Sequence, residues 1–308
     1  MDGDVKTLDG SRIAAEIRTE VDTAVHVLRE LGAVPRLDAV MVGEDPASKL
    51  YVGSKAKTLG ELGMVSRTHA LAADTTQPAI EALVDRLNAD PEVDGILVQL
   101  PLPGSIDTAS ILRRIDPNKD VDGFHPENVG LLQQGTPRFV PCTPAGIMTM
   151  LRRENIETEG RRAVVVGRSD IVGKPMAMLL LHAHATVTIC HSRTRNLAVV
   201  TREAEILIAA AGVCALIGPE HVADGAVVVD VGMHRLTDRA TVERLFSGNQ
   251  KKLAAFATRG AVLAGDVDAT RVAPKVGRLT PVPGGVGPLT IAMLAANTVK
   301  AAKLRRNL

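Results

Sequence analysis

The most informative stretch of this sequence is Arg162-Ala-Val-Val-Val-Gly-Arg-Ser-Asp-Ile-Val-Gly-Lys-Pro175, in which an apolar run passes into a glycine-containing loop. The apolar run predicts a buried parallel strand, and the residues that follow predict a helix to about His182. This order is typical of the start of a dinucleotide-binding βαβ unit. Because Gly167 and Gly173 lack the Gly-x-Gly-x-x-Gly spacing, the motif is weak by itself.

The next predicted strand, 185–190, strengthens this interpretation because it ends in His-Ser192-Arg193. Enzymes that bind NAD usually place Asp or Glu near this point to hold the ribose 2′-hydroxyl, and none stands here. Ser192, Arg193 and, after the first strand, Arg168 suit a 2′-phosphate instead. The arginines could also be exposed loop charges, but together they favour NADP as the cofactor.

The chain after this unit continues the pattern. Strands predicted at 206–210 and 226–230 end at small residues, which allow a cofactor to approach closely. Residues 238–260 carry apolar residues typical of a helical surface insertion and are expected to be peripheral. The stretch Pro281-Val-Pro-Gly-Gly-Val-Gly-Pro288 is either a tight path with exposed amides or a rigid linker. A helix predicted at 289–304 closes the chain.

The first half of the chain also alternates helices and strands. The sequence pattern predicts strands at 36–42, 65–71 and 95–100 and helices at 9–31, 77–88, 106–115 and 144–153. This alternation is typical of a parallel sheet covered by helices. Because 308 residues are many for one core, we predict two α/β domains. The boundary is placed where Thr143 is the expected N-cap of the last of these helices and Pro144 its first residue.

A candidate site lies on a helix predicted to begin with Ser48 as its N-cap. Tyr51 and Lys55 are four residues apart and therefore share one face of this helix. A ring beside an ammonium group can hold a flat polar substrate while the amine moves a proton. Taken alone, such a pair is more often a surface pair.

Two later segments point to the same chemistry. Gln99 ends the strand 95–100, at the sheet edge where open α/β sheets bind ligands, and a proline after it can be cis. Asp120 and Asp122 follow in a loop rich in Gly and Pro. These carboxylates either bind a substrate or cap their own backbone in an Asx-turn, and the sequence leaves both possibilities open.

Composition excludes several classes of function. The chain has 36 Lys and Arg against 35 Asp and Glu, and only 2% aromatic residues, so neither nucleic acid nor a membrane is an expected partner. Three cysteines without a Cys-x-x-Cys pair and a polar N-terminus predict a reduced, cytoplasmic protein. His182 and His184 have no third ligand at metal spacing, so no metal site is expected.

The assembled motifs resemble the bifunctional methylenetetrahydrofolate dehydrogenase/cyclohydrolase family. The matching pieces run in order along the chain: Val42-Gly-Glu-Asp-Pro-Ala-Ser48, Tyr51-Val-Gly-Ser-Lys55, Asp94-Gly-Ile-Leu-Val-Gln99, Lys119-Asp-Val-Asp122, Pro141-Cys-Thr-Pro144, Val166-Gly-Arg-Ser169, Cys190-His-Ser192, Gly265-Asp-Val-Asp268 and Pro281–Pro288. The resemblance implies an N-terminal three-layer α/β folate domain of residues 1–143 and 286–308, to which the last helix returns. It also implies a Rossmann domain of residues 144–285 with a parallel sheet, a homodimer through that domain, and folate in the interdomain cleft.

The resemblance also implies residue roles. Tyr51, Lys55, Gln99 and Asp122 match folate-site positions, with Lys55 as the catalytic group held by Gln99, and the loop containing Pro283, Gly284 and Gly285 matches the one that lines the folate. The positions that match NADP contacts are Gly167, Arg168, Ser169, Ser192 and Met233. The implied reactions of one-carbon metabolism are oxidation of 5,10-methylenetetrahydrofolate to the 5,10-methenyl form and its hydrolysis to 10-formyltetrahydrofolate.

One feature departs from the family pattern. Roughly twenty residues, 241–260, stand where similar proteins have a short connection, which is long for a loop in a compact domain. The alternatives are another two-domain NADP dehydrogenase, such as one acting on shikimate, and a non-catalytic folate-binding protein. The first gives no reason for the Tyr51–Lys55 and Pro281–Pro288 motifs to occur together, and the intact Lys55, Gln99 and Asp122 argue against the second.

Overall fold

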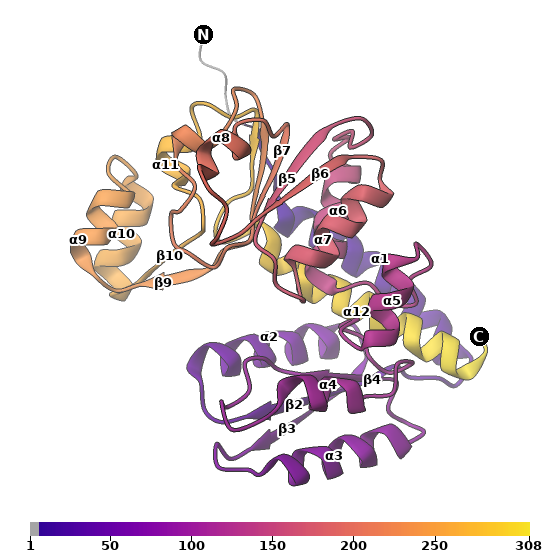
Figure 1. Ribbon diagram of the computed structural model, residues 1–308. Helices are drawn as coiled ribbons and strands as arrows, with labels where there is room; N and C mark the ends of the chain where they lie inside the picture. The colour runs from indigo at the N-terminus through magenta and orange to yellow at the C-terminus, as the bar shows by residue number, and fades with distance from the viewer. Residues whose placement is uncertain (1–5) are drawn as a thin grey trace. The chain divides into compact units, whose positions relative to one another are not determined.

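The computed structural model describes residues 6–308 (Figure 1). The described chain divides into two compact units, one of residues 14–142 with 291–308 and one of residues up to 13 with 143–290. The mixed α/β fold class predicted from the sequence is confirmed. The domain boundaries given above remain a prediction.

The unit of residues 14–142 and 291–308 contains a three-stranded parallel sheet. Its order is β3 (Val65–Leu71), β2 (Arg36–Val42), β4 (Gly95–Val98), which confirms the three predicted strands. Every residue of β2 and β4 is buried, as expected for strands of a parallel sheet that is covered on both faces.

Helices cover both faces of this sheet. This unit contains α2 (Pro46–Glu61), α3 (Gln77–Ala89), α4 (Thr108–Arg114) and α5 (Pro126–Gln133). It also contains most of α1 (Gly10–Glu30) and most of α12 (Val286–Arg306). Figure 1 shows α2 and α3 on opposite sides of the strands, and α3 and α4 pack their apolar residues against β2 and β4. The predicted return of the last helix is confirmed, because Arg305 and Arg306 donate to the fully buried carboxylate of Asp94 at 3.1 and 2.9 Å.

The predicted N-cap of α2 is wrong by three residues. The helix begins at Pro46, and the side chain of Asp45 caps it by accepting a hydrogen bond from the Ser48 backbone amide at 2.7 Å. Asp followed by Pro is a favourable start because proline needs no amide partner in the first turn. Ser48 therefore lies inside the helix and is not its N-cap.

The other unit is built on a six-stranded sheet, all parallel, whose order is β1-β11-β8-β7-β5-β6. The strands are β1 (Lys6–Thr7), β5 (Arg162–Val166), β6 (Thr186–Cys190), β7 (Ile206–Ala209), β8 (Val227–Asp230) and β11 (Arg278–Leu279). The remaining helices of this sheet are α6 (Cys142–Arg153), α7 (Gly173–His182), α8 (Leu197–Thr201), α11 (Ala269–Val272) and the 3-10 turn η1 (Pro219–His221). Helix α6 begins at Cys142, so the prediction of Thr143 as its N-cap is wrong.

Residues 234–264 extend from the end of β8. Strands β9 (His234–Leu236) and β10 (Val262–Ala264) form an antiparallel ribbon. Between them in the sequence come α9 (Arg239–Leu245) and α10 (Gln250–Arg259), which lie at the outer end of this ribbon (Figure 1). The helices predicted for this segment are confirmed. Within this segment Val242, Leu245 and Phe246 are buried in a small separate core with the two strands. The peripheral role of the segment remains a prediction.

Two sequence observations can be compared directly with the structure. The three cysteines are free thiols, two of them buried, in the part of the chain that is described. Among residues 6–308 no helix is both long and apolar enough to cross a membrane.

Candidate active site

Lys55 is the centre of the first candidate site. It lies on α2 and is only 7% exposed, and its Nζ donates to Oε1 of Gln99 at 3.1 Å. The same Nζ lies 4.9 Å from the centre of the Tyr51 ring, in reach of a cation–π interaction. Gln99 directly follows β4, and its own Nε2 donates to the Leu100 carbonyl at 2.7 Å, which orients the amide. Lys55 is therefore buried and hydrogen-bonded beside a half-buried Tyr51, and the two residues are not an exposed surface pair.

Asp122 belongs to the same group of side chains. The segment before it runs beside β4, since Asp120 bridges Ile96 in parallel register, and this places Asp122 level with the end of that strand. Burial raises the pKa of the Asp122 carboxyl to about 6, although the nearby charge of Lys55 acts to lower it. Within the described chain, the Asp122 carboxylate accepts a hydrogen bond from the thiol of Cys142 at 3.6 Å.

The two aspartates of this loop have different roles. The Asp120 carboxylate accepts bonds from the backbone amides of Phe124 and His125 and from the side chain of Asn128, at 2.8 to 3.2 Å. Asp120 therefore caps the backbone of its own loop, which is one of the two alternatives that the sequence left open. Asp122 makes no such cap among the described residues, so its oxygens are the ones that can bind a ligand.

Residues outside the predicted set hold this loop in place. Lys119 is 1% exposed and donates to three carbonyls, of Leu87, Asn88 and Asp90, at 2.7 to 2.9 Å. Asn297 of α12 donates to the Val121 carbonyl at 2.8 Å. Sequence reasoning missed Asn297, and the signal that could have found it is a single amide among the alanines of a buried helix.

The loop that matches the folate-lining segment belongs to the six-stranded unit. The Gly284 carbonyl accepts from the backbone amide of Ser11 at 2.9 Å. A Cβ on Gly10 would lie 1.7 Å from the Gly285 oxygen, so only glycine allows the start of α1 to approach the loop this closely. The loop contains a cis peptide bond before Pro283, and Pro101, after Gln99, is also cis, as anticipated for that position.

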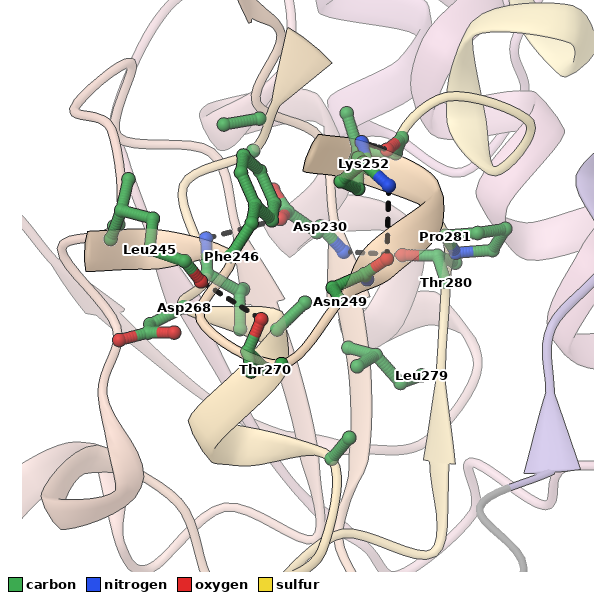
Figure 2. Close-up of a pocket in the computed structure, with 18 of the residues that line it drawn as sticks. Asp230, Leu245, Phe246, Asn249, Lys252, Asp268, Thr270, Leu279, Thr280 and Pro281 are labelled. Atoms are coloured by element: carbon green, nitrogen blue, oxygen red, sulfur yellow. Dashed lines mark hydrogen bonds between the residues drawn. The ribbon is translucent and has the colours of Figure 1, made fainter. Parts of the chain in front are cut away.

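A pocket of about 730 Å³ lies beside this loop, at the carboxyl ends of β8 and β11 (Figure 2). Asp230 is one of the residues that line it. Burial raises the pKa of the Asp230 carboxyl to about 7, although three backbone amides that donate to it act to lower the pKa. The Asp230 amide donates to Oγ1 of Thr280 at 2.7 Å. The polar groups of the pocket wall therefore hold the protein's own segments together.

The carboxyl end of β5 fits a dinucleotide. Gly167 has φ of +138°, and a Cβ there would lie 2.0 Å from the Ala210 carbonyl oxygen, so the chain leaves the strand along a path open only to glycine. The side chain of Ser169 accepts from the amides of Val172 and Gly173 at the start of α7, which closes the loop. Glycine at the turn and a helix start behind it are the features that a pyrophosphate needs.

The predicted phosphate-binding side chains surround this edge. Val166, the last residue of β5, pairs with Cys190, the last residue of β6. Arg168 therefore lies two residues after the end of β5, and Ser192 lies two residues after the end of the neighbouring β6. Arg168, Ser192 and Arg193 are exposed, and Met233 after β8 is 55% exposed. The structure thus gathers the predicted cofactor residues on the six-stranded unit, and Tyr51, Lys55, Gln99 and Asp122 on the other unit.

The six-stranded parallel sheet is of the Rossmann type, which is typical of enzymes that bind a dinucleotide. The second α/β unit carries the buried Lys55. Comparison with known families narrows this class. The catalytic domain of tetrahydrofolate dehydrogenase/cyclohydrolase matches residues 8–122, and the NAD(P)-binding domain of the same family matches residues 141–306. The chain belongs to the tetrahydrofolate dehydrogenase/cyclohydrolase family, which confirms the resemblance seen in the sequence.

Individual relatives agree over nearly the whole chain. Bifunctional protein FolD of Koribacter versatilis is 54% identical over 299 residues, 97% of this chain and 97% of that protein. The crystal structure of the bifunctional FolD enzyme of Campylobacter jejuni is 44% identical with a TM-score of 0.88, over 97% of this chain and 99% of that one. The Trypanosoma brucei enzyme, solved with NADP and an inhibitor, is 37% identical with a TM-score of 0.88 over 98% of both chains.

This chain and the Koribacter protein are nearly equal in overall length, because the 299 matched residues make up 97% of each.

Proposed function

We propose that Lys55 is the catalytic group of the cyclohydrolase reaction and that Tyr51, Gln99 and Asp122 bind the folate around it. The chain is an NADP-dependent methylenetetrahydrofolate dehydrogenase and a methenyltetrahydrofolate cyclohydrolase of one-carbon metabolism, as its family membership establishes. The observation that carries the proposal is the buried Lys55 ammonium, 3.1 Å from Gln99 and 4.9 Å from the Tyr51 ring.

The substrate's flat pterin ring needs a stacking surface and acceptors for its N–H groups. Tyr51 offers the ring, and the carboxylate of Asp122 accepts hydrogen bonds from amino and ring N–H groups. We assign Pro283, Gly284 and Gly285 as further folate contacts, because their backbone is held rigidly by Ser11 and Gly10.

NADP, when bound, supplies the hydride acceptor for the methylene carbon. Arg168, Ser192 and Arg193 would hold its 2′-phosphate with charge-assisted hydrogen bonds, and Gly167 and Ser169 would border its pyrophosphate. Met233 would contact it through its backbone. This fit is supported by the glycine-only path at Gly167 and by the exposed cations at the ends of β5 and β6.

Hydrolysis requires proton movement that hydride transfer does not. Water adds to the carbon between N5 and N10 of the methenyl cation and loses one proton, which gives a neutral hydroxyl adduct. The bond from that carbon to N5 then breaks while the hydroxyl gives up its proton to form the formyl C=O and N5 takes up a proton, so one proton is released overall. Lys55 is placed to polarise the adduct and to move these protons, while Gln99 fixes the direction of its ammonium group. Both roles need the side chain to be excluded from bulk water, as Lys55 is.

We further propose a cytoplasmic homodimer that associates through the six-stranded unit. Strand β6 is one edge of its sheet and leaves Ile189 40% exposed, and an open strand edge with an apolar residue is suited to pairing. The free thiols of all three cysteines support a reducing compartment.

The test of the function is an absorbance assay of NADPH formation from 5,10-methylenetetrahydrofolate, with NADP⁺ and NAD⁺ measured side by side. We expect turnover with a clear preference for NADP⁺ and decay of methenyltetrahydrofolate when it is supplied alone. Absence of turnover with either cofactor would reject the function, and a preference for NAD⁺ would reject the assignment of Arg168, Ser192 and Arg193.

A further inference from the structure

The segment 241–260 has one polar side chain that reaches beyond its own small core. Lys252 lies on α10, whose first turn is capped by Asn249 through a 3.1 Å bond to the Lys252 amide. Its Nζ lies 5.0 Å from the centre of the Phe246 ring, and Phe246 is buried against β10. The aliphatic stem of Lys252 is thus held on a rigid surface.

The ammonium group of Lys252 donates hydrogen bonds to two backbone carbonyls. Nζ donates to the Leu263 carbonyl at 2.5 Å and to the Val282 carbonyl at 2.6 Å. Burial lowers the pKa of this amine, which is consistent with a group drawn out of bulk water. Figure 2 shows Lys252 on the wall of the pocket, on the same side as Thr280 and Pro281.

Val282 is the second residue of the 281–288 loop and directly precedes Pro283, the first of the residues assigned above to the folate. On one side of it, Thr280 is bonded to the Asp230 amide at 2.7 Å, and on the other side, Gly284 is bonded to the Ser11 amide at 2.9 Å. Lys252 supplies a third attachment, and among these three it is the one that carries a charge. Ammonium–carbonyl bonds are stronger than neutral ones, so this attachment restrains the loop more than either neighbour does.

We propose that Lys252 is a positioning residue of the active site, which sets the position of the 281–288 loop and through it the affinity for the folate substrate. The inference rests on the proposed contact between this loop and the folate. It assigns segment 241–260 a role in substrate binding in place of the peripheral role expected from the sequence. Because the attachment is to the loop and not to β5 or β6, NADP binding is expected to be independent of it.

The test compares Lys252→Met with Lys251→Met, in which an exposed lysine next to it on α10 is changed in the same way. Methionine keeps the packing on Phe246 and removes the donors. We expect Lys252→Met to raise KM for methylenetetrahydrofolate and for methenyltetrahydrofolate by about tenfold, the loss of one charged hydrogen bond. KM for NADP⁺ should stay within about twofold of wild type, Lys252→Arg should restore most of the affinity, and Lys251→Met should match wild type.

Each result bears on one statement. Equal increases in KM for folate and NADP⁺, or a lower unfolding temperature with unchanged KM values, would show a merely structural role and overturn the inference alone. Lys252→Gln, which keeps a neutral donor, replaces Lys252→Met if that variant does not fold, with a smaller rise in folate KM expected. A wild-type enzyme that does not oxidise methylenetetrahydrofolate would instead reject the proposed function and this inference with it.

Discussion

The Lys55 group and the cofactor edge are built in opposite ways. Lys55 is almost completely buried and its ammonium is engaged by Gln99 and Tyr51, while burial raises the pKa of Asp122. Arg168 and Arg193, at the ends of β5 and β6, are exposed, and the shape of that edge comes from backbone at Gly167. Proton transfer needs side chains that are held in a defined position and partly excluded from water. Selection of a phosphate needs only cationic side chains close to where the phosphate binds.

The largest effect is expected at Lys55. Lys55→Met keeps most of the length and packing of the side chain and removes its charge and donors. We expect hydrolysis of supplied methenyltetrahydrofolate to slow by roughly 10²–10⁴, the usual contribution of a general acid–base group. The decay of methenyl absorbance measures this rate.

Lys57→Met is the matched control for this variant. Lys57 lies on the same helix, but its side chain is 77% exposed and pairs with Glu61. Its replacement should leave hydrolysis within about twofold of wild type, since an exposed pair contributes little. If the two variants behave alike, the burial of Lys55 has no catalytic meaning.

The next largest effect tests the exposed edge. Arg168→Ala should weaken NADP⁺ by about 1.5–3 kcal/mol, roughly 10- to 150-fold, because a charge-assisted bond to the 2′-phosphate is lost. NAD⁺ should be affected much less, and Arg202→Ala, which changes an exposed arginine just after α8, should affect neither cofactor. Steady-state KM values measure this, and equal weakening of both cofactors would contradict the assignment.

A pH profile distinguishes Asp122 from the exposed groups. Its carboxyl has a raised pKa of about 6 and must be ionised to accept bonds from the pterin. The value of kcat/KM for methylenetetrahydrofolate should therefore be constant above this pH and fall by about tenfold per unit below it, since protonation removes the acceptor. In Asp122→Asn the overall value should be lower and this inflection should disappear; an inflection that survives the substitution belongs to another group.

The smallest effect separates the two aspartates of one loop. Asp120→Asn should lower the free energy of unfolding by about 1–3 kcal/mol, because buried amide donors lose part of their partner, and it should leave folate KM nearly unchanged. Asp122→Asn should show the reverse pattern in thermal melts and kinetics. A common pattern for both variants would mean that their different environments do not correspond to different roles.

Much of this architecture could be predicted because local patterns agree with the fold. The strands β2 and β3 begin and end at the predicted residues. Arg168, Ser192 and Arg193 follow the ends of two paired strands because parallel strands end at one edge of the sheet. The start of α2 was misplaced because Asp45 and Ser48 are both good caps, and the choice depends on which of them has Pro next in the chain.

The remaining features depend on contacts between residues far apart in the chain. Nothing local distinguishes Asp120 from Asp122; the distinction arises because Asn128 and two loop amides bond to the first of them. Asn297 is 176 residues from the carbonyl that it holds. In the sequence Lys252 has the pattern of an ordinary surface lysine on a helix. Its bond to the Val282 carbonyl depends on the folding of the six-stranded unit, which places these two segments together.

The most direct test of the central claim, that Lys55 serves proton transfer and not hydride transfer, is a single time course on Lys55→Met. NADPH and methenyltetrahydrofolate are followed together after mixing the variant with methylenetetrahydrofolate and NADP⁺. We expect NADPH formation to continue at a rate close to that of wild type, with methenyltetrahydrofolate accumulating in nearly equal amount. If NADPH formation falls as far as methenyl hydrolysis does, Lys55 only binds the substrate, and the division of chemistry described here is wrong.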